Sequence, residues 1–318
     1  MSIFPCLVGP KDIAVGSMRQ IIDAGLEAAD IAEELMDLSQ STETRILDVF
    51  VMVESMRVAL AEVDSKININ TFKTLFQVLN KEKMSDSLSL IHEVDDLSSR
   101  CLNQSIALTK AANRGASLLP DSYKDENSIC SLVEIQKDLQ NLENAVLQLR
   151  NLIDLVNQMN IFHACTTGTD ALDTLLNQKS LILMTFQRIC SLNESISKWS
   201  KILVPDNCCG QLKLSIACVK VVNDMNNASA IIQKLALEGG KLFGVMKDLI
   251  VATWEKIESF PAEFDAGKKI KTIVNCTSTN VPVEKLLDAG GDLVGNIASN
   301  RPGLFKNPIQ SFRGFLMG

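Results

Sequence analysis

Aromatic residues make up only 5% of this 318-residue chain, with one tyrosine and two tryptophans. Proteins that stack nucleobases or grip partners through aromatic anchors carry more of them. Proline and glycine are also scarce, at 8 and 16 residues, which favours long uninterrupted helices over a turn-rich β fold. Basic residues are too few to balance the acidic ones, and the net charge of -7 argues against a nucleic-acid backbone as partner.

Long apolar runs are absent too. The longest stretch without a charged residue, 155–169, is largely polar and too short to cross a bilayer as a helix. The N-terminal stretch MSIFPCLVGPKDIAVG lacks the basic start and apolar core of a secretory signal. The nine cysteines are an odd number, which favours reduced thiols over a disulfide framework. These features predict a cytoplasmic protein, with membrane association or non-classical export as alternatives.

Motifs for catalysis and metal binding are missing as well. His92 has two acids at helical spacing, a pattern typical of the solvated face of a helix. His163 and Cys165 are too close together for a zinc-ligand pair, and no second pair completes four ligands. The thiols at 208–209 lack the spacing of an exchange site, and the glycines at 290–291 lack the rest of a phosphate-binding loop. We therefore expect no metal, no cofactor and no enzymatic activity.

Helical periodicity is what the sequence has in abundance. Apolar residues recur at alternating spacings of three and four at Leu132, Ile135, Leu139, Leu142, Val146, Leu149, Ile153 and Val156. This 3.5-residue period indicates a helix whose apolar seam packs lengthwise on a neighbour, as in a coiled coil. The same spacing occurs at Ile46, Val49, Val53, Met56, Leu60 and Val63. Because residues 47 and 50–52 are also apolar, we expect this second helix to have neighbours on all sides.

Polar residues and glycines suggest where the other helices begin and end. Further helices are predicted over 18–38, 71–83, 88–113 (with the polar residues 85–87 as its start signal), 170–203 and 212–260. Ser41 or Thr42 is expected to cap a break after the first of these, with one rod of about fifty residues as the alternative. Gly239 and Gly240 predict a kink or a close helix crossing, and Pro261 is expected to end the last long helix.

These patterns predict an all-α fold. We expect an elongated antiparallel bundle of about five to seven long helices over residues 1–261. A small C-terminal appendage follows over 262–318. It is predicted to contain a short strand or loop at 271–275, a glycine-bearing helix and an amphipathic end.

Apolar helical seams in a sequence without catalytic or metal-binding motifs favour a non-enzymatic interaction or scaffold protein. Its partner is expected to be another protein or a copy of itself. A membrane-active bundle, pore-forming or membrane-remodelling, is the first alternative, and an all-α enzyme using carboxylates from different helices is the second. The candidate contact with a membrane or partner is an apolar set near one face of the last segment: Ile309, Phe312, Phe315 and Leu316. Docking of this segment back on the bundle is the simpler structural interpretation.

Overall fold

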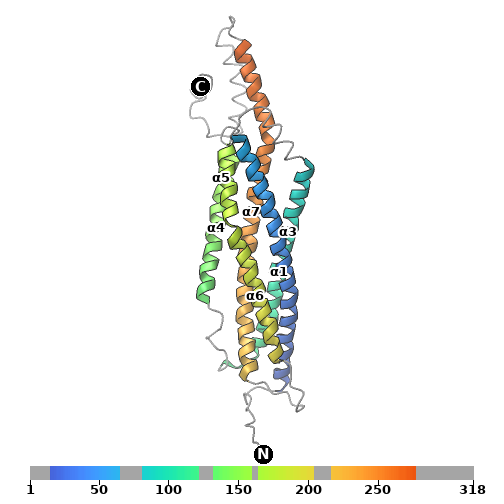
Figure 1. Cartoon of the computed structure of the whole chain (residues 1–318). Helices are drawn as coiled ribbons and strands as arrows, with labels where there is room; N and C mark the ends of the chain where they lie inside the picture. Colours follow the sequence, from blue (N-terminus) through green and yellow to red (C-terminus); the bar gives the residue numbers. More distant parts are fainter. Residues whose placement is uncertain (1–14, 65–80, 122–131, 160–163, 204–215, 277–318) are drawn as a thin grey trace, which may run out of the picture. The chain divides into compact units, whose positions relative to one another are not determined.

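The computed structural model describes residues 15–64, 81–121, 132–159, 164–203 and 216–276, and no strand occurs among them (Figure 1). The elements are α1 (Val15–Asp64), α3 (Lys81–Ser117), α4 (Leu132–Gln158), α5 (Ala164–Asn177), α6 (Lys179–Leu203) and α7 (Ile216–Cys276). The predicted all-α fold is therefore confirmed. The chain divides into two units between Ile257 and Glu258, and the bundle described below belongs to the first.

Helices α1 and α3 lie side by side in opposite directions (Figure 1). As residue numbers rise along α1, those of the bonded partners on α3 fall. The pairs are Glu27–Arg114, Glu34–Gln104 and Arg45–Glu93. An α-helix rises 1.5 Å per residue, so the 50 residues of α1 form a rod of about 75 Å along which such pairs are distributed.

Helices α5 and α6 together run antiparallel to α1. Their bonded pairs with α1 are Glu33–Ser197, Glu43–Gln187 and Arg57–Asp173. The register is kept across the interruption at Gln178, where the Gln178 amide donates to the Leu175 carbonyl and the Gln178 carbonyl accepts from Ile182. The sequence prediction of one helix from Asp170 is thus wrong in two respects: helix begins at Ala164, and it is interrupted at Gln178.

Helix α7 approaches α6 and α3 closely at its paired glycines. A Cβ atom added to Gly239 would lie 3.1 Å from Thr185 Cγ2 on α6. One added to Gly240 would lie 3.2 Å from Ser98 Oγ on α3. These distances are shorter than ordinary van der Waals contact, so the close crossing predicted at these glycines is confirmed.

The predicted apolar seams form the core. On α1, Ile46, Val49, Val53 and Leu60 are fully buried. On α4, Leu142, Leu149 and Val156 are fully buried, whereas Leu139 and Ile153 on the same seam are half-buried. The stripe of α4 packs against α5 and α6, and the ion pair between Asp138 and Arg188, 3.0 Å long, joins α4 to α6.

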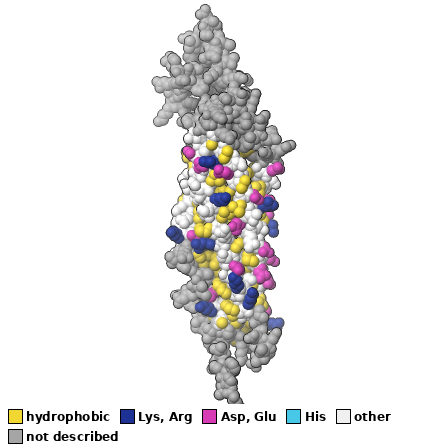
Figure 2. Space-filling model, viewed as in Figure 1, with side chains coloured by type: hydrophobic (Ala, Val, Ile, Leu, Met, Phe, Trp, Pro, Cys, Tyr) yellow, Lys and Arg dark blue, Asp and Glu magenta, His cyan; other side chains and the backbone are white. Residues whose placement is uncertain are grey.

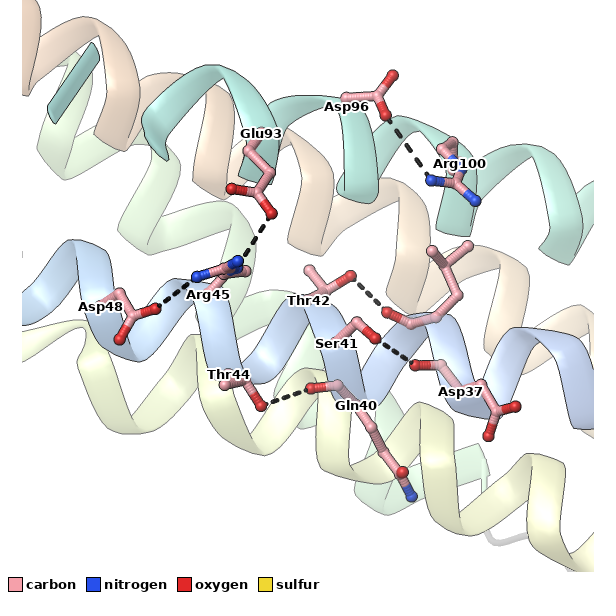
Figure 3. Close-up of polar contacts among 11 residues, drawn as sticks. Asp37, Gln40, Ser41, Thr42, Thr44, Arg45, Asp48, Glu93, Asp96 and Arg100 are labelled. Carbon is pink, nitrogen blue, oxygen red and sulfur yellow. Dashed lines mark hydrogen bonds and ion pairs between the residues drawn. The ribbon is translucent and has the colours of Figure 1, made fainter. Parts of the chain in front are cut away.

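The predicted break near Ser41 and Thr42 does not occur, and α1 is the single rod that was the alternative. Figure 3 shows what the two side chains do instead of capping. The hydroxyls of Ser41 and Thr42 donate to the carbonyl oxygens of Asp37 and Leu38, one turn back in the same helix. Serine and threonine can cap a helix end or bond back within a helix, and in α1 they do the second.

Two other predicted helix ends are also wrong. Helix α3 begins at Lys81, so the polar residues at 85–87 lie inside it rather than before it. Helix α7 continues through Pro261 to Cys276, so residues 271–275 are helical and not a strand. Proline lacks the N–H that would bond to the carbonyl four residues back, here that of Ile257. The missing bond thus falls where the chain divides into its two units.

Candidate interaction surface

Most residues that the sequence marked as candidates lie outside the described part of the chain. Ile309, Phe312, Phe315 and Leu316, the predicted membrane or partner contact, fall in the range 277–318. His163, the thiols at 208–209 and the glycines at 290–291 are also outside it, as is the side chain of Cys165. The predicted roles of these residues stay predictions.

His92 is exposed on α3, as its surroundings in the sequence suggested. Its two neighbouring acids are engaged elsewhere: Asp95 accepts from Lys247 Nζ at 2.7 Å, and Asp96 pairs with Arg100 at 4.0 Å. Within the described ranges, no three His, Cys, Asp or Glu residues are grouped so that they could hold a metal ion.

Two of the described thiols, those of Cys101 and Cys190, are placed to stay protonated. Burial raises the pKa of Cys101, against smaller opposing effects of hydrogen bonds with Thr42 and Ser39. Burial, assisted by the nearby negative charge of Glu43, raises the pKa of Cys190 to about 11. Because the thiolate is the nucleophile, these two cysteines are poor candidates for chemistry.

A groove of about 590 Å³, lined by both polar and apolar side chains, lies between α1 and α3. Its walls carry Glu34 and Asp37 from α1, and Arg100, Asn103 and Gln104 from α3. Figure 3 shows the ion pairs along this seam, including Arg45 held between Asp48 and Glu93. A carboxylate enzyme of the kind considered from the sequence needs acids from different helices in one pocket. Both acids of this groove come from α1, so it does not provide that arrangement.

The outer face of α1 carries an exposed apolar stripe, which consists of Leu47, Val51 and Val58. Their side chains are 37%, 66% and 43% exposed. Their spacing of four and seven residues places them on one side of the helix. The prediction that α1 is surrounded on all sides over this stretch is therefore wrong: Phe50 is buried, but Leu47 and Val51 face outward.

The line of surface positions reached from Val51 and Val58 at seven-residue steps is acidic nearer the N-terminus of α1. At seven-residue steps the line reads Asp23, Asp30, Asp37, Thr44, Val51 and Val58, and all six residues are exposed. Among the described residues, the side chains of the three aspartates form no ion pair. This line of the helix surface thus changes from acidic to apolar along its length. On the face of the molecule shown in Figure 2, hydrophobic side chains lie between charged side chains of both signs.

Sequence reasoning missed this surface for an identifiable reason. Leu47 and Val51 were assigned to a helix buried all round because the stretch is densely apolar. The seven-residue line that begins at Asp23 was the available signal, since a position acidic for three heptads is a solvent-facing position. Extending that line to Val51 and Val58 would have indicated that both are exposed.

None of the described helices has an apolar stretch of the length needed to span a bilayer. Comparisons with protein-family models, with curated proteins and with solved structures found no match to this chain.

Proposed function

We propose that this protein is a non-enzymatic interaction protein, a helical scaffold that presents the outer face of α1 to a partner helix. The apolar stripe of Leu47, Val51 and Val58 is the observation that carries the proposal. Three aligned apolar side chains on an otherwise packed helix lose contact with water only when something covers them.

The arrangement fits a partner helix better than a small molecule. A helix laid along α1 meets the stripe at residues spaced by three, four or seven, which is the recognition pattern of helix-in-groove and coiled-coil contacts. The line from Asp23 to Asp37 continues the same surface, so the complementary partner is an amphipathic helix that is apolar towards one end and basic towards the other.

Membrane activity and carboxylate catalysis stay as the alternatives stated from the sequence. No described feature favours either over a protein partner. The apolar residues Ile46, Val49 and Val53, which a pore-forming mechanism would expose, are buried in the bundle.

Affinity capture from lysate of the protein's own cells tests the proposal. The full chain is compared with the double variant Val51→Glu/Val58→Glu, which places two charges in the stripe. We expect the double variant to lose its specific partner by at least tenfold, since each factor of ten needs only about 1.4 kcal/mol.

The matched control is Leu237→Gln. Leu237 is an exposed apolar residue, 39% exposed, on α7 and therefore on a different helix from the stripe. This variant should capture the partner as the wild type does. Equal capture by the wild type and the double variant, with both folded by circular dichroism, would reject the stripe as the contact.

A further inference from the structure

Helix α4 has an outer face of unusual composition. Eight of its exposed residues are amides: Gln136, Gln140, Asn141, Asn144, Gln148, Asn151, Asn157 and Gln158. Between them lie two exposed leucines, Leu147 and Leu155, which are 59% and 52% exposed. An amide side chain both donates and accepts hydrogen bonds, so a face built of amides can pair with an identical face.

The exposed charges on this face cancel. They are two basic and two acidic residues: Lys137, Glu143, Arg150 and Asp154. Within the described structure, none of the four has an ion-pair partner in the chain. Glu143 accepts only a long hydrogen bond of 3.4 Å from Gln140. The whole chain carries a net charge of -7, so this neutral face is one on which two copies do not repel each other.

The order of these residues is self-complementary about Leu147. Gln140 and Asp154 lie seven residues before and after it, on the same line of the helix. Glu143 lies four residues before it and Arg150 three residues after it, and both fall on one flank of that line. Asn144 and Asn151 occupy the other flank in the same way.

We propose that the outer face of α4 pairs with the same face of a second copy of this chain, antiparallel, with a two-fold axis at Leu147. The inference rests on the proposed function, because it names one partner of an interaction protein. In an antiparallel helix pair each flank meets the same flank of the other helix. Glu143 then faces Arg150 of the second copy, and the symmetry repeats this contact.

The remaining contacts are also complementary. Asp154 faces Gln140 of the second copy at the same level, and an amide can donate to a carboxylate. Asn144 faces Asn151 of the second copy, while the two Leu147 side chains cover each other at the axis. A parallel pair would instead set each Asp154 against its own copy. Like charges so placed disfavour association, so the antiparallel arrangement is the favoured one.

Sedimentation equilibrium of the purified full chain tests this pairing. Concentrations up to about 100 µM are used, so that a weakly associating dimer is also detected. We expect the wild type to dimerise. Glu143→Arg and Arg150→Glu should each weaken the dimer at least about tenfold, because each variant sets like charges against each other twice per dimer.

The decisive experiment exchanges the charges at positions 143 and 150. The double variant Glu143→Arg/Arg150→Glu should dimerise as the wild type does, because the attractive contact is restored with reversed signs. An equimolar mixture of the two single variants should also form dimers, since every Arg then faces a Glu. These restorations cannot come from a change in folding, which circular dichroism of each variant checks independently.

Leu147→Gln and Leu155→Gln form a matched pair of variants. Both remove an exposed leucine from α4, but Leu155 lies about a quarter turn round the helix from Leu147. Only Leu147→Gln should weaken the dimer.

Three results would overturn the pairing: a wild type that is monomeric throughout, a dimer insensitive to both single charge reversals, or a double variant that stays monomeric. A monomer whose capture of a partner still depends on Val51 and Val58 would reject the α4 pairing while the proposed function stands. Loss of that dependence with an intact α4 dimer would instead reject the α1 stripe.

Discussion

Gly239 and Gly244 lie five residues apart in α7 but have different surroundings. A Cβ atom on Gly239 would meet Thr185 and Phe186 of α6, whereas one on Gly244 would meet nothing within 4 Å. Gly244→Ala should therefore raise the free energy of unfolding by roughly 0.5–1 kcal/mol, because alanine restricts the unfolded chain and favours helix. Gly239→Val should lower it by about 1–3 kcal/mol through overpacking. Chemical denaturation measures both, and stabilisation by Gly239→Val would contradict the close crossing.

Cys190 leads to a pH prediction. Its pKa of about 11 in the folded chain is above the ordinary value of 9.0, so the folded state favours the protonated thiol. This contribution to stability is fully present below pH 9 and is lost as the pH rises towards 11. The free energy of unfolding of the wild type should therefore fall more steeply over this window than that of Cys190→Ala. Parallel curves for the two proteins would contradict the raised pKa.

At the scale of the element, continuity of α1 through Ser41 is open to test. Proline at this position would remove the backbone bond to the Asp37 carbonyl and clash with the preceding turn, which costs about 3 kcal/mol inside a helix. Ser41→Pro should lower the free energy of unfolding by that order. Ser41→Ala should change it by less than about 0.5 kcal/mol, as exposed helix-surface substitutions do. A helix start at Ser41 would give the opposite ranking, with proline tolerated and the loss of a cap harmful.

Helix interiors were more predictable from the sequence than helix ends. The spacing of Ile46, Val49 and Val53 predicts which side of α1 faces the core, because apolar residues that recur with a 3.5-residue period lie along one side of a helix. Helix ends depend on the weaker preferences of single residues for beginning or ending a helix, and tertiary packing overrides these preferences. The same serine can cap a helix or bond back within it, and Pro261 lies inside α7 despite the missing bond.

At the scale of the whole molecule, the sequence gives the density of apolar residues but not the number of neighbours that cover them. Leu47 and Phe50 look equivalent in the sequence, yet Phe50 is 1% exposed and Leu47 is 37% exposed. Which residue is covered depends on the placement of α3, α5 and α6 around α1. The candidate surface therefore emerged from the packed bundle, although the acidic line from Asp23 to Asp37 marks its direction.

The central claim is that the outer face of α1 contacts another protein. Site-specific photo-crosslinking in the protein's own cells tests it most directly, with benzoylphenylalanine placed at Val51 and, in a separate variant, at Asn113. Both positions are exposed, but Asn113 is on α3, away from the stripe. The account predicts a discrete crosslinked protein product from position 51 and none from position 113. No product from position 51, or the same products from both positions, would contradict it.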